Sequence, residues 1–303
     1  MSRLYIIGNG FDLYHNLPTR FDPDFRKIAE HNEANPYFWD LYTVYGNEIW
    51  SDFEHLLAKP DFNSLLEIFD NYYPDYLSDH ESDRNSIISV AEEIGNLSDS
   101  LLEFAEEADE SLANIEEQSE LVEEFTKDDV FINFNYTHTL EKLYNIAENR
   151  ILHIHGEVGC NNLLIGYPEG EYSPEKFFDD VRKKGRGPYR EVEFERYLEE
   201  KSKDIDSFDY YVDTAYSTLL STTKSFSKKP QIDLMKSFLA DKKIEEIVIR
   251  GHSCAIDIPY FYELSKKYPN AKWTFYPFDD KTEQNIFKVI ECIELKKYEV
   301  VPY

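Results

Sequence analysis

Two glycines one residue apart follow the first apolar run of the chain. The run is Leu4–Ile7, and the segment after it is Gly8-Asn9-Gly10. Such a pair lets the backbone turn sharply and come close to a phosphate group. The usual dinucleotide-binding pattern would have a third glycine at position 13, where this chain has Leu13. The segment predicts either a phosphate-binding turn or an ordinary turn from strand to helix.

Two asparagines lie near the end of the apolar run Val130–Phe134. Asn133 and Asn135 are two positions apart, so a strand places both side chains on the same side. An amide group both donates and accepts hydrogen bonds, so it can hold a ribose hydroxyl or orient a water molecule. The alternative is that one or both side chains satisfy backbone groups of a local turn.

Two histidines alternate with apolar residues in the predicted strand Ile151–His155. Both imidazoles, those of His153 and His155, are expected on one side of the strand. A His-x-His strand can bind a metal ion, but a further ligand does not follow at any recognisable spacing. We therefore expect no metal. A histidine at a strand end suits proton transfer, because its unperturbed pKa lies near neutrality, and His155 is the candidate base.

A fourth polar segment follows the apolar run Glu245–Ile249. Gly251 and Ser253 come just after this predicted strand, and Asp257 stands where a helix should begin. In open parallel sheets, ligands bind beyond the carboxyl ends of the strands, so these residues are candidates for ligand contact. The alternative for Asp257 is a plain helix cap.

The order of predicted elements defines the fold class. Apolar runs and helical periodicity alternate as strand, helices, strand-helix-strand, helices, and strand-helix-strand-helix, which predicts an α/β fold with a mostly parallel sheet covered on both faces. The predicted strands are Leu4–Ile7, Val130–Phe134, Ile151–His155, Leu163–Ile165, Glu245–Ile249 and Lys272–Tyr276. The predicted helices of the core are His138–Ala147, Asp257–Lys267 and Glu283–Ile293.

Two helical insertions are predicted within this core. The core comprises residues 1–35, 128–170 and 241–303, and the insertions are residues 36–127 and 171–240. The first insertion is acidic, since Lys and Arg are absent from 85–126, where apolar residues recur every three to four positions. Its acidic face is either simply solvated or a docking surface for a partner.

Composition limits the partners. The chain has 32 basic and 60 acidic residues, a formal net charge of −28, which disfavours general binding to nucleic acid or to anionic membranes. The three cysteines form no CxxC pair, so a disulfide framework and a four-cysteine zinc site are not expected. The first residues hold too short an apolar run for a signal peptide, and no run reaches the roughly 18 apolar residues of a membrane helix. These features predict a cytoplasmic protein.

Taken together, the polar segments resemble the AbiH family of bacterial abortive-infection proteins, which act against phage. The matching segments are Gly8–Asp12, Leu17–Thr19, Phe134–Glu141, Ile154–Gly156, Gly251–Ser253 and Asp257. They are also similar, more distantly, to the Sir2 fold, a Rossmann-like fold that binds NAD. The resemblance implies that Asn135 orients a ribose or a water molecule and that His155 is the catalytic base.

The Sir2 resemblance also implies the residues that hold NAD. Gly8 and Gly10 would bind the dinucleotide, and Gly251 with Ser253 would hold the adenosine-side ribose. Asp12 stands where Sir2 proteins usually have Ser, and it could bind a ribose hydroxyl instead. Sir2 deacetylases carry a four-cysteine zinc module that this chain lacks. Sir2-like defence proteins also lack that module, and the similarity to them implies hydrolysis of NAD.

These features combine into one functional expectation. The chain is expected to be an antiphage effector that hydrolyses NAD to nicotinamide and ADP-ribose, without a metal. The expected catalytic residues are Asn135 and His155, and the expected ligand-binding residues are Gly8, Asn9, Gly10, Asp12, Gly251, Ser253 and Asp257. The alternatives are a non-catalytic nucleotide-binding sensor or assembly module, and a nucleic-acid hydrolase. A homo-oligomer and a phage-derived or neighbouring-gene trigger are further expectations.

Overall fold

A computed structural model describes most of one compact unit of the chain and short parts of a second. The described residues are 2–31, 42, 49–50, 52–59, 89, 97–160, 162–169 and 226–301. Unit 1 comprises Met1–Ala29, Ser98–Ile165 and Lys229–Tyr303, and unit 2 comprises Glu30–Leu97 and Gly166–Lys228. Residues 98–127 and 229–240, predicted as parts of the two insertions, fall in unit 1 with the sheet.

Unit 1 is built on a six-stranded sheet in which every pair of neighbouring strands is parallel. The strands are β1 (Arg3–Ile7), β2 (Val130–Asn133), β3 (Ile151–His153), β6 (Glu246–Arg250), β7 (Lys272–Tyr276) and β8 (Tyr298–Val300). Their order across the sheet is β3-β2-β1-β6-β7-β8. The chain therefore adds strands on one side of β1 and then on the other, and the order reverses between β1 and β6. This confirms the predicted α/β class with a parallel sheet.

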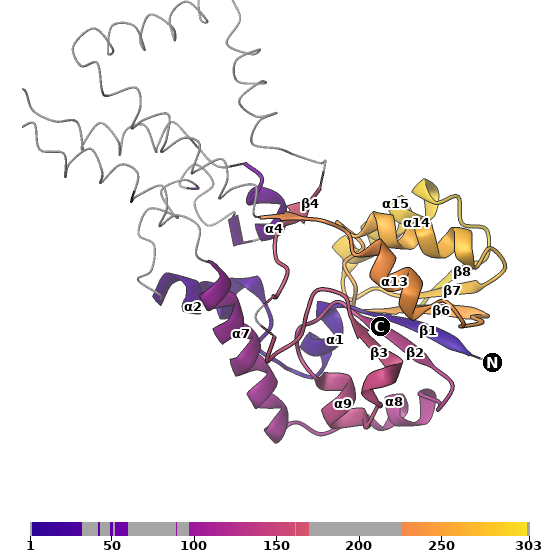
Figure 1. Cartoon of the computed structure of the whole chain (residues 1–303), viewed down its shortest axis with the longest axis horizontal. Coiled ribbons are helices and arrows are strands. Elements are labelled where there is room, and N and C mark those ends of the chain that lie inside the picture. The colour runs from indigo at the N-terminus through magenta and orange to yellow at the C-terminus, as the bar shows by residue number, and fades with distance from the viewer. Residues whose placement is uncertain are drawn as a thin grey trace, which may run out of the picture. The chain divides into compact units, whose positions relative to one another are not determined.

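Helices cover both faces of this sheet (Figure 1). The α-helices are α1 (Asn9–Tyr14), α2 (Arg26–His31), α7 (Leu97–Ser111), α8 (Ser119–Glu124), α9 (Thr139–Tyr144), α13 (Ile232–Phe238), α14 (Ile258–Lys267) and α15 (Asp280–Cys292). A π-helical turn spans Phe21–Phe25, and short 3-10 turns span Leu112–Asn114 and Glu148–Arg150. In unit 2 the described elements are α4 (Phe53–Leu56) and a parallel pair of short strands, β4 (Tyr167–Pro168) and β5 (Ser227–Lys228).

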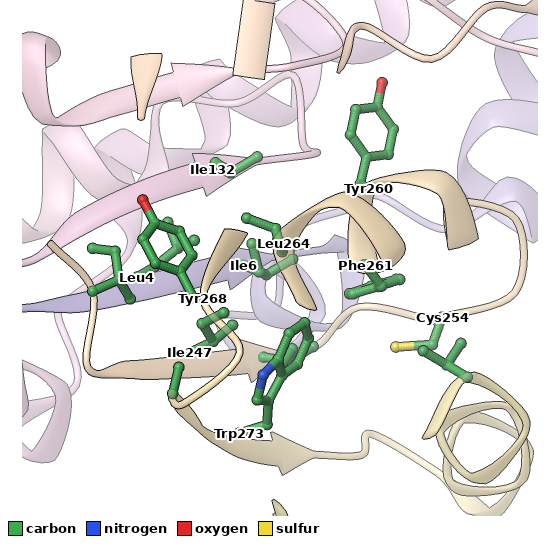
Figure 2. Packing of buried hydrophobic residues seen from close by; sticks show 14 of the residues in the cluster. Leu4, Ile6, Ile132, Ile247, Cys254, Tyr260, Phe261, Leu264, Tyr268 and Trp273 are labelled. Atoms are coloured by element: carbon green, nitrogen blue, oxygen red, sulfur yellow. The ribbon is translucent and has the colours of Figure 1, made fainter. Parts of the chain in front are cut away.

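Alternation along the strands divides the core between the two faces. In β1, Leu4 and Ile6 belong to a cluster that contains apolar residues of α13, α14 and α15, whereas Tyr5 and Ile7 belong to a cluster with residues of α1, α8 and α9. Figure 2 shows the first cluster, where Phe261 of α14 lies near the strands. A strand buried on both faces must be apolar at every position, which explains the compact run that begins the chain.

Most predicted strands are confirmed to within two residues, one predicted strand is absent, and the edge strand of the main sheet was not predicted. Residues Leu163–Ile165 do not form a strand, and the nearest strand is β4 in unit 2, which pairs with β5. The edge strand β8 was missed, because Tyr298 and Glu299 are exposed and its sequence is too short and polar to show a strand pattern.

Some predictions concern residues outside the described ranges. The helical pattern predicted over 36–127 and 171–240 lies partly there, and the described portions contain α4, α7, α8, α13 and β5. Among the helices of the described residues, none combines the length and the apolar character required to cross a lipid bilayer.

Candidate active site

The turns that follow β1 and β6 pack directly against each other at the place where the strand order reverses. The Gly10 N–H donates to the Gly251 carbonyl at 2.7 Å, and the Gly8 N–H donates to the Arg250 carbonyl at 3.1 Å. A Cβ atom on Gly8 would lie 2.5 Å from the His252 Cα. The glycines therefore allow the backbones of the two turns to come into direct contact. A role in phosphate binding stays a prediction, and these two N–H groups already have carbonyl acceptors.

The exposed polar residues of these turns are Asn9 and Ser253. The Asn9 amide donates to the Thr19 carbonyl at 2.7 Å, which holds the segment after α1 against the turn. The Ser253 hydroxyl accepts from the Ala255 N–H at 3.4 Å. Both side chains lie at the solvent side of the reversal.

The two asparagines of the second segment have different partners. The Asn133 side-chain oxygen accepts from the Asn135 N–H at 3.0 Å, the arrangement of a local turn. The Asn135 amide donates to the Gly8 carbonyl at 3.1 Å and so ties the turn after β2 to the turn after β1. The structure thus brings Asn135 and Gly8 together, as the common sheet edge predicts.

Asp12 lies below these turns with its carboxylate buried. Its two oxygens accept from the hydroxyls of Thr137 at 2.5 Å and Thr139 at 2.8 Å. Burial raises the pKa of Asp12 to about 6, even though the hydrogen bonds from these threonines and from Asn135 favour the carboxylate. Contact between Asp12 and a ribose stays a prediction; the described partners of the carboxylate are side chains of the protein.

The raised pKa of Asp12 predicts a specific pH dependence of stability. Between the unfolded pKa of 3.8 and the folded pKa of about 6, the folded chain binds more protons, so stability contributed by this group falls as pH rises. Asp12→Asn removes that titration. We expect the unfolding free energy of the unmodified chain, relative to Asp12→Asn, to fall by about 1 kcal/mol between roughly pH 5 and 7.5 in urea titrations. A difference independent of pH would contradict this assignment.

A second buried polar group at this edge consists of His155, His252 and Asp257. The Asp257 carboxylate lies between the two imidazoles, 3.6 Å from His155 Nε2 and 3.3 Å from His252 Nε2. All three residues are at most 6% exposed. The Phe134 ring packs edge-on against both imidazoles, with centroids 4.9 Å from His155 and 4.4 Å from His252. In such apolar surroundings, electrostatic interactions between these groups are stronger than in water.

Asp257 precedes α14 but does not cap it through its side chain. From the sequence, a plain helix cap was the alternative role for this residue. Asp279 is an example of a side-chain cap in this chain. The Asp279 carboxylate accepts from the Thr282 N–H at 2.7 Å at the start of α15. The Asp257 carboxylate faces two histidines instead, and its contact with a ligand stays a prediction.

His252 is a site residue that the sequence analysis did not select. The Cys254 N–H donates to His252 Nδ1 at 3.0 Å, so Nδ1 is the acceptor nitrogen of the neutral ring and Nε2 carries the proton toward Asp257. The available signal was its position between Gly251 and Ser253, directly after a strand. Cys254 itself has a φ of +53°, and burial, followed by the charge of Asp257, raises the pKa of its thiol. These surroundings disfavour the reactive thiolate form of Cys254.

His153 points into a different group from His155. Its Nε2 lies 2.8 Å from Glu141 Oε1 on α9, and its Nδ1 lies 3.2 Å from the Asn135 carbonyl oxygen. The prediction that a strand places both imidazoles on one side is therefore wrong. β3 ends at His153, so strand alternation does not extend to His155.

Chemically, the arrangement around Asp257 provides a base and a carboxylate to orient it. A carboxylate beside an imidazole stabilises the imidazolium that forms when the ring takes a proton. The fold and this group define an α/β protein with a parallel sheet and a buried His–Asp–His cluster at its carboxyl edge.

Comparison of the sequence with protein families gives the family of this α/β protein. The family model described as bacteriophage abortive infection AbiH matches residues 4–277, and the chain belongs to this family. The predicted membership is confirmed, and the family indicates a role in abortive infection of phage. Searches of curated proteins and of solved structures found no match.

Proposed function

We propose that the chain acts in abortive infection by hydrolysing the bond between nicotinamide and ribose in NAD. The observation that carries the proposal is the buried pair of His155 and Asp257 beside the reversal of strand order. Counted along the chain, the six strands have the order 3-2-1-4-5-6. Dinucleotide-binding Rossmann sheets have this order and bind their ligand at the reversal, and Sir2 proteins share that class of fold.

The chemistry requires little besides shielding, orientation and one base. The bond between the ribose C1′ and the nicotinamide nitrogen breaks, and its electron pair leaves with nicotinamide as a neutral molecule. A water oxygen forms the new bond to C1′, and its proton passes to the His155 imidazole, which later releases it to solvent. Asp257 stabilises the imidazolium, and the low exposure of the group limits access of other water molecules.

The remaining residues would position the dinucleotide. Asn9 and Ser253 are exposed on the two turns and would contact phosphate or ribose. Asn135, fixed to Gly8, would orient the attacking water or a ribose hydroxyl. Asp12 would act through the threonine hydroxyls that it holds.

The test is a chromatographic assay of NAD incubated with the purified chain. We expect nicotinamide and ADP-ribose to appear with the unmodified chain, and His155→Ala and Asn135→Ala to slow their release by about 10²-fold or more. His31→Ala is the matched control, because His31 is exposed on α2. Equal release from His155→Ala and the unmodified chain would refute the proposed base. NAD hydrolysis would be refuted if no nicotinamide were released either by the purified chain or by the chain in phage-infected cells.

A second candidate function is nucleotide binding without turnover. It is favoured by the engagement of Asp12 and Asn135 with protein groups, which is typical of a structural role. NAD that is retained intact through gel filtration, with no nicotinamide released during infection, would support this candidate over hydrolysis.

A further inference from the structure

A second polar cluster lies beside the turn after β2, apart from the His–Asp–His group. It combines His153 at the end of β3, Glu141 on α9 and Glu157 in the turn after β3. One ligand atom of each residue lies within 4.8 Å of those of the other two. His153 Nε2 is 2.8 Å from Glu141 Oε1 and 3.7 Å from Glu157 Oε2. His138 adjoins the cluster, with its Nε2 3.3 Å from Glu157 Oε2.

Both histidines are anchored through the nitrogen that points away from the cluster. His153 Nδ1 lies 3.2 Å from the Asn135 carbonyl oxygen, and His138 Nδ1 lies 3.2 Å from Asp109 Oδ2. An imidazole that donates from Nδ1 to a carbonyl or carboxylate presents Nε2 as a lone-pair donor. Metal-binding histidines are usually held in this way, because the outer hydrogen bond fixes both tautomer and ring orientation.

One carboxylate oxygen in the cluster lacks a hydrogen-bond donor. Among the described residues, Glu141 Oε2 is a buried oxygen with no hydrogen-bond partner, although Glu141 Oε1 contacts His153. A buried carboxylate oxygen that is left unsatisfied is costly. A cation between Glu141, His153 and Glu157 would satisfy it.

The spacing of these donors fits a small transition-metal ion. Donors that surround zinc tetrahedrally at about 2.0–2.1 Å are about 3.3 Å apart. The distances from His153 Nε2 to Glu141 and Glu157, and from His138 Nε2 to Glu157, are 2.8, 3.7 and 3.3 Å. Small side-chain adjustments would bring the donors of Glu141, His153 and Glu157 to the required spacing, and His138 would have to move closer to complete the set.

We propose that Glu141, His153 and Glu157 bind a divalent transition-metal ion of the zinc class, with His138 as a fourth ligand. Mixed imidazole and carboxylate ligands suit zinc, whereas magnesium and calcium prefer oxygen ligands alone. Through His153 and the Asn135 carbonyl, the ion would stiffen the turn after β2. The expectation of no metal came from spacing along the chain, and these ligands come from separate elements. The proposal is independent of NAD hydrolysis, and its test measures metal alone.

The experiment uses the full chain, stripped with a chelator, exposed to zinc chloride and desalted, with retained zinc measured by mass spectrometry. We expect about one zinc per chain, a higher melting temperature with zinc, and no retention of magnesium. Glu141→Gln and Glu157→Gln should each weaken zinc binding tenfold or more. The Glu157 side chain is 41% exposed, so its substitution leaves folding intact.

Glu291→Gln, an exposed glutamate on α15, is the matched control and should bind zinc as the unmodified chain does. The proposal is overturned if the stripped unmodified chain retains no zinc. It is also overturned if Glu157→Gln and Glu141→Gln retain as much zinc as Glu291→Gln.

Discussion

Gly251→Ala is expected to destabilise the chain by about 2–5 kcal/mol, the largest effect of any substitution to alanine at the turns after β1 and β6. Gly251 has a φ of +65°, and an added Cβ would lie 2.1 Å from the Phe11 nitrogen and 2.5 Å from the Gly10 carbonyl carbon. The left-handed conformation costs an L-residue roughly 1–2 kcal/mol. The overlap adds about 1–3 kcal/mol, since backbone atoms of another turn cannot rotate away.

Two other glycines separate the conformational part of this cost from the steric part. Gly159 has a φ of +86° with nothing within 4 Å of an added Cβ, so Gly159→Ala should cost about 1–2 kcal/mol. Gly8 has a φ of −128°, and an added Cβ would lie 2.5 Å from the His252 Cα, so Gly8→Ala carries the overlap alone. Unfolding in urea gives all three values. If Gly251→Ala proves no more destabilising than Gly159→Ala, the close packing of the two turns is refuted.

Asp257→Asn is expected to lower the rate of NAD cleavage by about 10²–10⁴-fold while the chain stays folded. The amide keeps the shape of the side chain but cannot stabilise an imidazolium at His155, which lies 3.6 Å away. A comparable substitution in a serine-protease triad lowers turnover by about 10⁴-fold. This prediction rests on the proposed function. The loss should appear in kcat, with KM for NAD nearly unchanged, because Asp257 acts through His155.

The matched control for Asp257→Asn is Asp279→Asn on α15. Asp279 is a helix cap whose carboxylate accepts from the Thr282 N–H, and asparagine is an equally good cap. Asp279→Asn should therefore retain both cleavage and stability. Cleavage that survives Asp257→Asn at the rate of the control would exclude the carboxylate from the reaction.

Local patterns were sufficient to predict the framework of the sheet. The strand at Leu4–Ile7 is apolar at every position, and the strand at Lys272–Tyr276 is buried at Trp273, Thr274 and Phe275. Helices cover both strands, and such burial is recognisable from residue type alone. Local patterns did not predict β8, which is three residues long, partly exposed and paired with β7 alone. They also failed at Leu163–Ile165, where apolar residues lie in a loop.

The positions of the candidate site residues were predictable, but their partners were not. Parallel strands end at one edge, so the sequence alone determined that the segments after β1, β2 and β6 meet. Only the tertiary structure decided that Asp257 faces His155 and His252. The same holds for the hydrogen bonds that Asp12 accepts from two threonines and for the cluster of His153 with two glutamates. The physical reason is that residue type and periodicity specify only which face of an element is buried. The partner of a side chain depends on packing between segments that can be more than a hundred residues apart, as for His155 and Asp257.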